Sequence, residues 1–291
     1  MTKTSDDTTF KNYYRLAKPG IIYGNLITAI AGFLFGAEGN INVTQLLAMS
    51  VGVSLIIACG CVLNNIIDIK VDKLMTRTKK RELVTNKISV RSAYVYAYIL
   101  GVVGFVTLEY FTNRLTVLCG IVGLVFYVGV YSVAKRSTVH GTLIGTISGA
   151  TPPVAGYLAA TNRLDRASLL LFLVLVFWQM PHFFAIAIRR ISDYSNAHIP
   201  VLPLVKGLKR TKVQIIIYIL GFIIVTLLFR YYGYVGPVYT LSMTLTGLWW
   251  LYISVKGLSA LNSQEWAKKV FLASLVSLVV FDIMISVSHY M

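Results

Sequence analysis

Long apolar stretches alternate with shorter polar segments along almost the whole chain. Each stretch holds about 17 to 22 residues, the length at which an α-helix crosses the roughly 30 Å hydrocarbon core of a bilayer. We therefore predict an all-α, polytopic membrane protein with about nine transmembrane helices. The predicted spans are 21–37, 45–66, 94–112, 115–134, 141–160, 168–188, 213–230, 234–254 and 270–289.

The composition supports the same class of protein. Hydrophobic residues make up 56% of the 291 residues, charged residues only 13%, and the mean hydropathy is +0.71, whereas soluble domains are about a quarter charged. The first 20 residues are polar and basic without an apolar centre, so we expect no cleaved signal peptide. We expect a single integral-membrane domain, 1–291, with a flexible tail over 1–12.

The net charge of +16 is distributed in a way that predicts the topology. With nine spans and a cytoplasmic N-terminus, the inner side holds 23 of the 27 Lys and Arg residues. Such an excess is the positive-inside pattern of a bacterial inner-membrane protein, and it places the long loops 67–93 and 189–212 in the cytoplasm. A nucleic-acid-binding function is excluded, because no soluble basic domain is present.

An acidic stripe marks the start of the first long loop. Asn64, Asp68 and Asp72 are spaced four residues apart, so on a helix they share one face. One interpretation is a solvated helix end with polar i,i+4 pairs. The other is a Mg²⁺ site, because two carboxylates and an amide oxygen suit an ion that takes its remaining ligands from water and substrate phosphates.

A basic cluster follows this stripe. Positive-inside topology explains part of it, but Arg77, Lys80 and Arg81 next to a Mg²⁺ site are also typical of an anion clamp. Arginine binds phosphate oxygens through paired hydrogen bonds and lysine acts as a point charge. We expect a diphosphate site, with Lys206 of the second loop as a further candidate, and inside a membrane we expect the diphosphate to belong to a lipid-like molecule.

The stripe and its basic continuation resemble the first aspartate-rich motif of the UbiA-type intramembrane prenyltransferases. The resemblance covers roughly residues 10–290 and implies a helical bundle that uses Mg²⁺ to bind and ionise a prenyl diphosphate at a cytoplasmic opening. The second motif of that family is reduced here: Asp193 is followed four residues later by Ala197, so the second loop offers one carboxylate. Asp193 joins Asn64, Asp68 and Asp72 as a catalytic candidate.

Three further stretches narrow the resemblance. The first, RLAKPGIIYGNLIT (15–28), resembles the opening of the family. The other two resemble the branch of the family whose acceptor is protohaem IX; they are AKRSTVHGTLIGTISGATPPVAGY (134–157) and FWQMPHFFAIAIRRISDYSNAHIPVLP (177–203). The resemblance implies that the farnesyl group of farnesyl diphosphate is transferred to a vinyl group of haem b, with water addition, giving haem O. It also suggests a terminal oxidase or a haem A synthase as partner.

Several polar residues inside the predicted spans are candidates for contact with haem. His182 follows Pro181 near the inner end of span 168–188, where it is either a haem ligand or a structural hydrogen-bonding group between helices. Trp178 and Gln179 lie one turn earlier, and Asn25 lies inside the first span. Pro152 and Pro153, in the middle of span 141–160, predict a kink that shapes a cavity.

Two other functions remain open from the residues alone. The acceptor could be an aromatic quinone precursor in place of haem. The protein could also be a haem or ion carrier without catalysis, although carrier sites normally lie near the bilayer midplane and these carboxylates lie at its edge.

Overall fold

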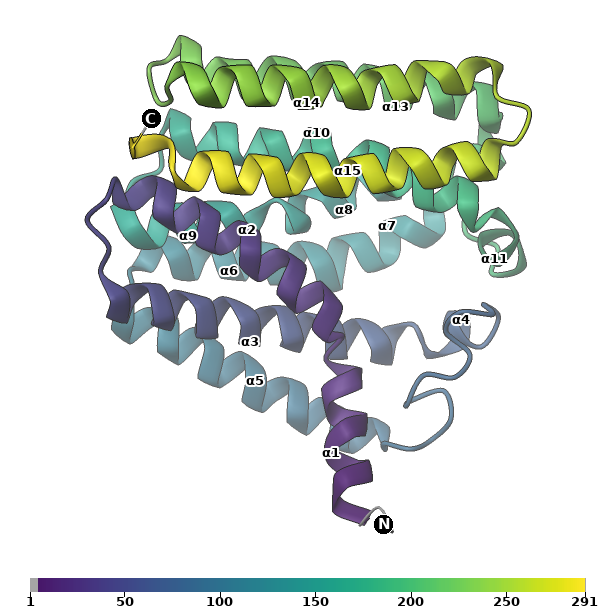
Figure 1. Ribbon diagram of the computed structural model, residues 1–291. Coiled ribbons are helices and arrows are strands. Elements are labelled where there is room, and N and C mark those ends of the chain that lie inside the picture. Colours follow the sequence, from purple (N-terminus) through teal and green to yellow (C-terminus); the bar gives the residue numbers. More distant parts are fainter. Residues whose placement is uncertain (1–4, 291) are drawn as a thin grey trace.

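The computed structural model describes residues 5–290, and every regular element in that range is helical. The predicted all-α class is confirmed. The predicted tail over 1–12 lies partly outside the described residues, since the description begins at Ser5, the first residue of α1 (Ser5–Leu16). The long helices run side by side, and α1 lies across their common direction (Figure 1).

Long helices form the bundle and short ones connect them. The long helices are α2 (Pro19–Ala37), α3 (Val43–Ile67), α5 (Val90–Phe111), α6 (Arg114–Val125), α9 (Thr151–Thr161), α10 (Arg166–Arg189), α13 (Gly207–Tyr231), α14 (Pro237–Val255) and α15 (Ser263–Ser286). The shorter ones are α4 (Ile69–Asp72), α7 (Ser132–Ser137), α8 (Gly141–Gly149), α11 (Ile191–Asn196) and α12 (Leu202–Val205), with a π-helical segment, η1 (Phe126–Tyr131), between α6 and α7.

Each predicted span falls on helical chain. Among the described residues, seven helical stretches are long and apolar enough to cross a membrane, with α6, η1 and α7 counted as one, so the chain is a multi-pass membrane protein. The two other predicted spans are 141–160, which is divided between α8 and α9, and 234–254, which lies in α14 except for its first three residues. The count of nine spans stays a prediction.

The division between α8 and α9 has a local cause. Gly149 ends α8, and Pro152 and Pro153 lie in the first turn of α9. Proline is tolerated at a helix start because the N–H groups of the first turn have no partner within the helix, whereas in a helix interior it breaks the ladder of hydrogen bonds. The predicted kink is confirmed.

Helices α2 and α9 approach each other closely through two glycines. A Cβ atom on Gly156 would lie 1.9 Å from the carbonyl oxygen of Ala29, and one on Gly32 would lie 2.0 Å from the carbonyl oxygen of Pro153. Small residues at such a contact let two backbones pack directly in a membrane, where the hydrophobic effect does not drive helices together. This contact holds α9 against α2.

We expect Gly156→Ala to lower thermal stability in detergent, because the added methyl must push α2 and α9 apart. Overpacking of this kind costs about 1–3 kcal/mol. Gly129→Ala is the matched control, since a Cβ atom at Gly129 meets nothing within 4 Å. Equal melting temperatures for the two variants in a thermal unfolding assay would contradict the close-packing argument.

Candidate active site

The acidic stripe continues in helical register beyond the end of α3. The amide N–H of Asp68 donates to the carbonyl of Asn64 at 2.9 Å, and that of Asp72 donates to the carbonyl of Asp68 at 2.8 Å. All three side chains therefore lie on one face, as their spacing predicts, and all three line the same cavity. Each of these residues is buried, with at most 7% of its surface exposed.

The cavity has a volume of about 880 Å³, near the upper end of the roughly 300–1,000 Å³ typical of ligand sites. One part of its wall is polar and carries the acidic stripe. Another part is lined by apolar and aromatic residues from the middle of the bundle, among them Val53, Ile56, Trp178 and Leu275. The arrangement suits a ligand with an anionic end and a large apolar body.

Two cations from α7 hold the carboxylate of Asp68. Lys135 Nζ donates to Oδ2, and Arg136 Nη2 donates to Oδ1 at 2.6 Å. Burial favours the neutral carboxyl group, but the attraction and hydrogen bonds of these cations outweigh it, so the pKa of Asp68 lies below its usual value. Asp68 is therefore a carboxylate at neutral pH.

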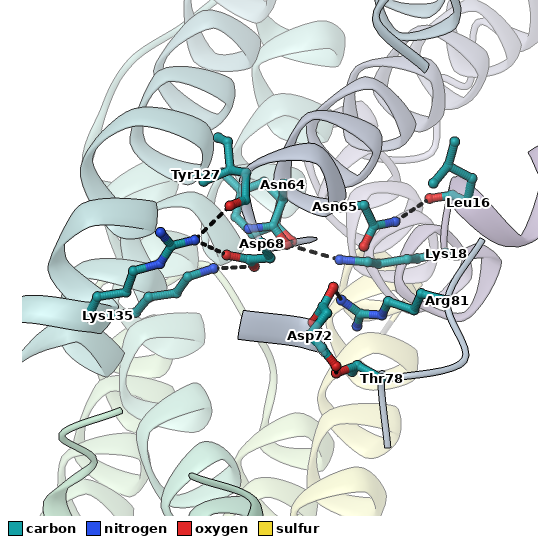
Figure 2. A network of polar contacts seen from close by, with 12 residues as sticks. Leu16, Lys18, Asn64, Asn65, Asp68, Asp72, Thr78, Arg81, Tyr127 and Lys135 are labelled. Atoms are coloured by element: carbon teal, nitrogen blue, oxygen red, sulfur yellow. Dashed lines mark hydrogen bonds and ion pairs between the residues drawn. The ribbon is translucent and has the colours of Figure 1, made fainter. Parts of the chain in front are cut away.

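The carboxylate of Asp72 has its own cation. The loop after α4 turns back, so that Arg81 Nη1 donates to Asp72 Oδ2 at 2.7 Å (Figure 2). Thr78 fixes the turn by donating from its hydroxyl to the carbonyl of Asp72 at 3.0 Å. The chain is not a continuous helix from Arg77 to Arg81, yet both arginines line the cavity.

A fourth cation reaches the stripe from the residue that precedes α2. Lys18 Nζ donates to Asn64 Oδ1 at 3.0 Å (Figure 2), and burial lowers the pKa of Lys18 to about 8. Its backbone is left-handed, with φ 56°, directly before Pro19. Such a conformation costs about 1–3 kcal/mol and persists where the surroundings enforce it.

The donor chemistry of the stripe fits a hard divalent cation that is only partly enclosed by protein. Among residues 5–290, no group of three or more His, Cys, Asp and Glu side chains is arranged to hold a metal. The stripe offers two carboxylates and an amide oxygen, which together suit Mg²⁺ bound through one or two carboxylates with phosphate oxygens and water in the remaining positions.

The other predicted phosphate and catalytic residues lie outside the cavity wall. Lys80 and Lys206 are exposed and do not line the cavity. Asp193 is buried, at 6% exposure, and its Oδ1 accepts a hydrogen bond from the amide N–H of Thr76 at 3.2 Å. Asp193 therefore connects α11 to the loop that carries Arg77 and Arg81.

The residues predicted to contact haem do line the cavity. Trp178, Gln179 and His182 are buried on α10. The Nε2 of Gln179 donates to the carbonyl of Leu175 at 3.1 Å, and Asn25 donates from its side chain to the carbonyl of Ile21 at 2.8 Å. These four residues therefore border one cavity, and their contact with haem stays a prediction.

Sequence reasoning missed three cations that bind the acidic stripe. It counted Lys18, Lys135 and Arg136 only toward topology, although two of them bind Asp68 and one binds Asn64. Lys135 is 67 residues from Asp68 and Lys18 is 46 residues from Asn64, so no local spacing pairs them. One indication of these contacts was present in the sequence: Lys18, Lys135 and Arg136 are predicted to lie on the same side of the membrane as the acidic stripe.

The helical bundle and the acidic stripe are features of a known class of membrane enzyme, the intramembrane prenyltransferases. The profile of the UbiA prenyltransferase family matches residues 25–275, and the chain belongs to this family. Proteins named protoheme IX farnesyltransferase are similar over nearly the full length. The protein from Pectobacterium atrosepticum is 47% identical over 279 residues, 95% of this chain and 94% of the relative, and the one from Yersinia pseudotuberculosis is 45% identical over 278 residues, with the same coverage.

Solved structures share the fold. A digeranylgeranylglyceryl phosphate synthase superposes with a TM-score of 0.81 at 19% identity, covering 97% of this chain and 99% of the other. A UbiA homologue from Archaeoglobus fulgidus, bound to GPP and Mg²⁺, superposes with a TM-score of 0.73 at 17% identity, covering 94% and 99%. The predicted UbiA-type bundle is confirmed.

We expect Arg81→Met to weaken the binding of inorganic diphosphate, measured by calorimetry in the presence of Mg²⁺, by about tenfold or more. The reason is that a hydrogen bond to a charged group contributes about 1.5–3 kcal/mol, and Arg81 is the cation that faces Asp72 in the cavity. Lys79→Met removes a charge from the same loop at an exposed position outside the cavity wall and serves as control. Equal losses in both variants would mean that only the general charge of the loop matters.

Proposed function

We propose that the protein transfers the farnesyl group of farnesyl diphosphate to a vinyl group of protohaem IX, adding water and giving haem O and diphosphate. The observation that carries this proposal is the 45–47% identity, across about 95% of the chain, to proteins named protoheme IX farnesyltransferase. The cavity supports it physically, because a polar wall and a wide aromatic wall belong to one space.

The polar wall would bind the diphosphate. Asp68 and Asp72, helped by Asn64, are the residues that would hold Mg²⁺, with Asp193 as a further carboxylate near the opening. A bound Mg²⁺ supplies Lewis-acid stabilisation of the charge that develops on the leaving oxygen. Arg77 and Arg81 add charge-assisted hydrogen bonds to the diphosphate oxygens, and Lys80 and Lys206 add positive charge at the loop surface.

The apolar wall would bind the farnesyl chain and the acceptor. Trp178, Gln179, His182 and Asn25 line the cavity and are the residues assigned to haem. As the carbon–oxygen bond of farnesyl diphosphate breaks, the π electrons of the vinyl group form the new carbon–carbon bond. Water then adds to the resulting cation beside the ring and releases a proton, so the product carries a hydroxyethylfarnesyl group. The buried wall excludes water from the earlier allylic cation.

The membrane setting belongs to the same proposal. The distribution of Lys and Arg supports a cytoplasmic N-terminus and cytoplasmic loops around the polar wall, in the inner membrane of a bacterium. Figure 1 supports this arrangement: α4 and α11, which carry the loops of the polar wall, lie at one end of the bundle, and the C-terminus lies at the other. A terminal oxidase or a haem A synthase would receive the product.

We expect the purified protein in detergent to convert haem b and farnesyl diphosphate to haem O, detected by mass spectrometry, with activity lost in EDTA. Hydroxybenzoate offered as the acceptor tests the quinone-precursor alternative, and we expect no prenylated product from it. Prenylation of hydroxybenzoate but not haem would overturn the acceptor assignment. Absence of diphosphate release with any acceptor would favour a carrier.

Asp68→Asn and Asp72→Asn should each lower the rate of haem O formation by about 100-fold or more, because each removes a charged ligand from the proposed metal site. Glu109→Gln makes the same carboxylate-to-amide change at an exposed position on α5, and we expect it to leave the rate unchanged. Melting temperatures would show that the variants are folded. Full activity in both aspartate variants would refute the metal assignment.

A further inference from the structure

We propose that His182 is an axial ligand of the haem iron through its Nε2 atom, and that Ser274 on α15 is the positioning residue that keeps this atom unprotonated. The proposal rests on the proposed function, since it takes haem as the acceptor. It assigns a specific contact inside the cavity, where the sequence left a choice between a haem ligand and a structural histidine.

The hydroxyl of Ser274 determines the tautomer of His182. Ser274 Oγ lies 2.5 Å from the carbonyl oxygen of Phe271 and 2.8 Å from His182 Nδ1. A carbonyl oxygen can only accept, so the single hydroxyl proton of Ser274 is directed at Phe271. The Ser274 oxygen must then accept from His182, which requires that Nδ1 carries the proton. In a neutral imidazole, Nε2 consequently has a free lone pair.

The imidazole ring is held in one orientation. Its centroid lies 4.8 Å from the Trp178 ring, with an interplanar angle of 27°, and 4.8 Å from the Phe271 ring, with an angle of 34°. Trp178 is itself fixed by Ser274, because its Nε1 donates to the Ser274 carbonyl at 2.7 Å. The backbone and the side chain of Ser274 thus fix two neighbouring rings on α10.

The Nε2 atom of His182 is open to the cavity. It makes no hydrogen bond with any of the described residues. It is nevertheless accessible, because it is absent from the fully buried side-chain atoms that lack a partner. His182 itself lines the cavity. A lone pair that faces a ligand space, on a ring whose other nitrogen donates to a fixed acceptor, is the usual arrangement of a metal-binding histidine.

This tautomer distinguishes between two kinds of contact with haem. A histidine that binds a propionate must donate a proton to it, and Nε2 has none to donate. A histidine that binds iron must offer a lone pair, which Nε2 does. Ligation of the iron would hold the macrocycle at a fixed distance from α10, in the same cavity as the diphosphate wall, and so fix the acceptor relative to the donor.

The test compares haem with metal-free protoporphyrin IX, bound to the purified protein in detergent and followed by absorbance and fluorescence. We expect His182→Ala to change the Soret spectrum of bound haem and weaken its binding by about tenfold or more, with imidazole restoring the spectrum. Binding of metal-free protoporphyrin should change less than twofold, which also shows that the variant is folded. His289→Ala is the control for loss of a histidine, because His289 is exposed and lies beyond the C-terminal end of α15.

Ser274→Ala tests the positioning role. It removes the acceptor of the Nδ1 proton, and loss of such a partner costs about 10–100-fold in metal affinity, so we expect weaker haem binding with an altered Soret band. Ser277→Ala is the matched control on the same helix, because Ser277 Oγ is buried and donates only to the carbonyl of Ala273 at 2.9 Å. We expect the Ser277 variant to match the unmodified protein.

The outcomes separate this inference from the proposed function. If the unmodified protein makes haem O but His182→Ala keeps the same haem spectrum, or loses both porphyrins equally, iron ligation is wrong and the function stands. If the unmodified protein neither binds haem nor converts it, the proposed function is wrong. Equal effects of Ser274→Ala and Ser277→Ala would overturn the positioning role.

Discussion

The structure depends on keeping two carboxylates charged at the edge of an apolar bundle. Removing a carboxylate from water costs several kcal/mol, and an unpaired charge at Asp68 or Asp72 would destabilise this end of the bundle. The neutralising cations come from separate parts of the chain: Lys135 and Arg136 from α7, and Arg81 from the loop after α4. The acidic stripe therefore ties these segments into one fixed wall.

The acidic stripe is surrounded by more positive charge than its two carboxylates need. Lys18, Arg77, Arg81, Lys135 and Arg136 surround only two carboxylates, Asp68 and Asp72. An excess of three positive charges (five cations against two carboxylates) in a partly buried site attracts a multiply charged anion, since the low dielectric strengthens each interaction. The metal would occupy the carboxylates, and a diphosphate would then take over some of the cations that hold them in its absence.

Local patterns predicted the local parts of this architecture. Spacing of four residues placed Asn64, Asp68 and Asp72 on one face, and apolar length located the long helices, because both features depend only on helix geometry. The Pro152–Pro153 pair predicted the break in a span for the same reason.

Contacts between residues that are distant in the sequence could not be predicted from local patterns. Lys135 and Lys18 reach the stripe through tertiary packing, so their basic character suggested nothing beyond topology. Neighbouring residues also differ in their surroundings: Arg81 lines the cavity while Lys80 is exposed, because the chain turns after α4. The hydroxyl of Ser274 on α15 has no sequence relation to His182 on α10, and only their contact reveals the tautomer.

A stretch of chain and one hydrogen bond join the acceptor wall to the donor wall. Helix α10 carries the wall assigned to the acceptor, and α11 follows it directly with Asp193, whose carboxylate accepts from the amide of Thr76. Thr76 immediately precedes Arg77 in the loop of the polar wall. A displacement of this loop is therefore transmitted to α11 by a hydrogen bond and to α10 by the backbone. This link restrains the donor wall relative to the acceptor wall. A reaction between two bound substrates benefits from such restraint, because most of the gain from bringing reactants together is lost when their geometry is loose.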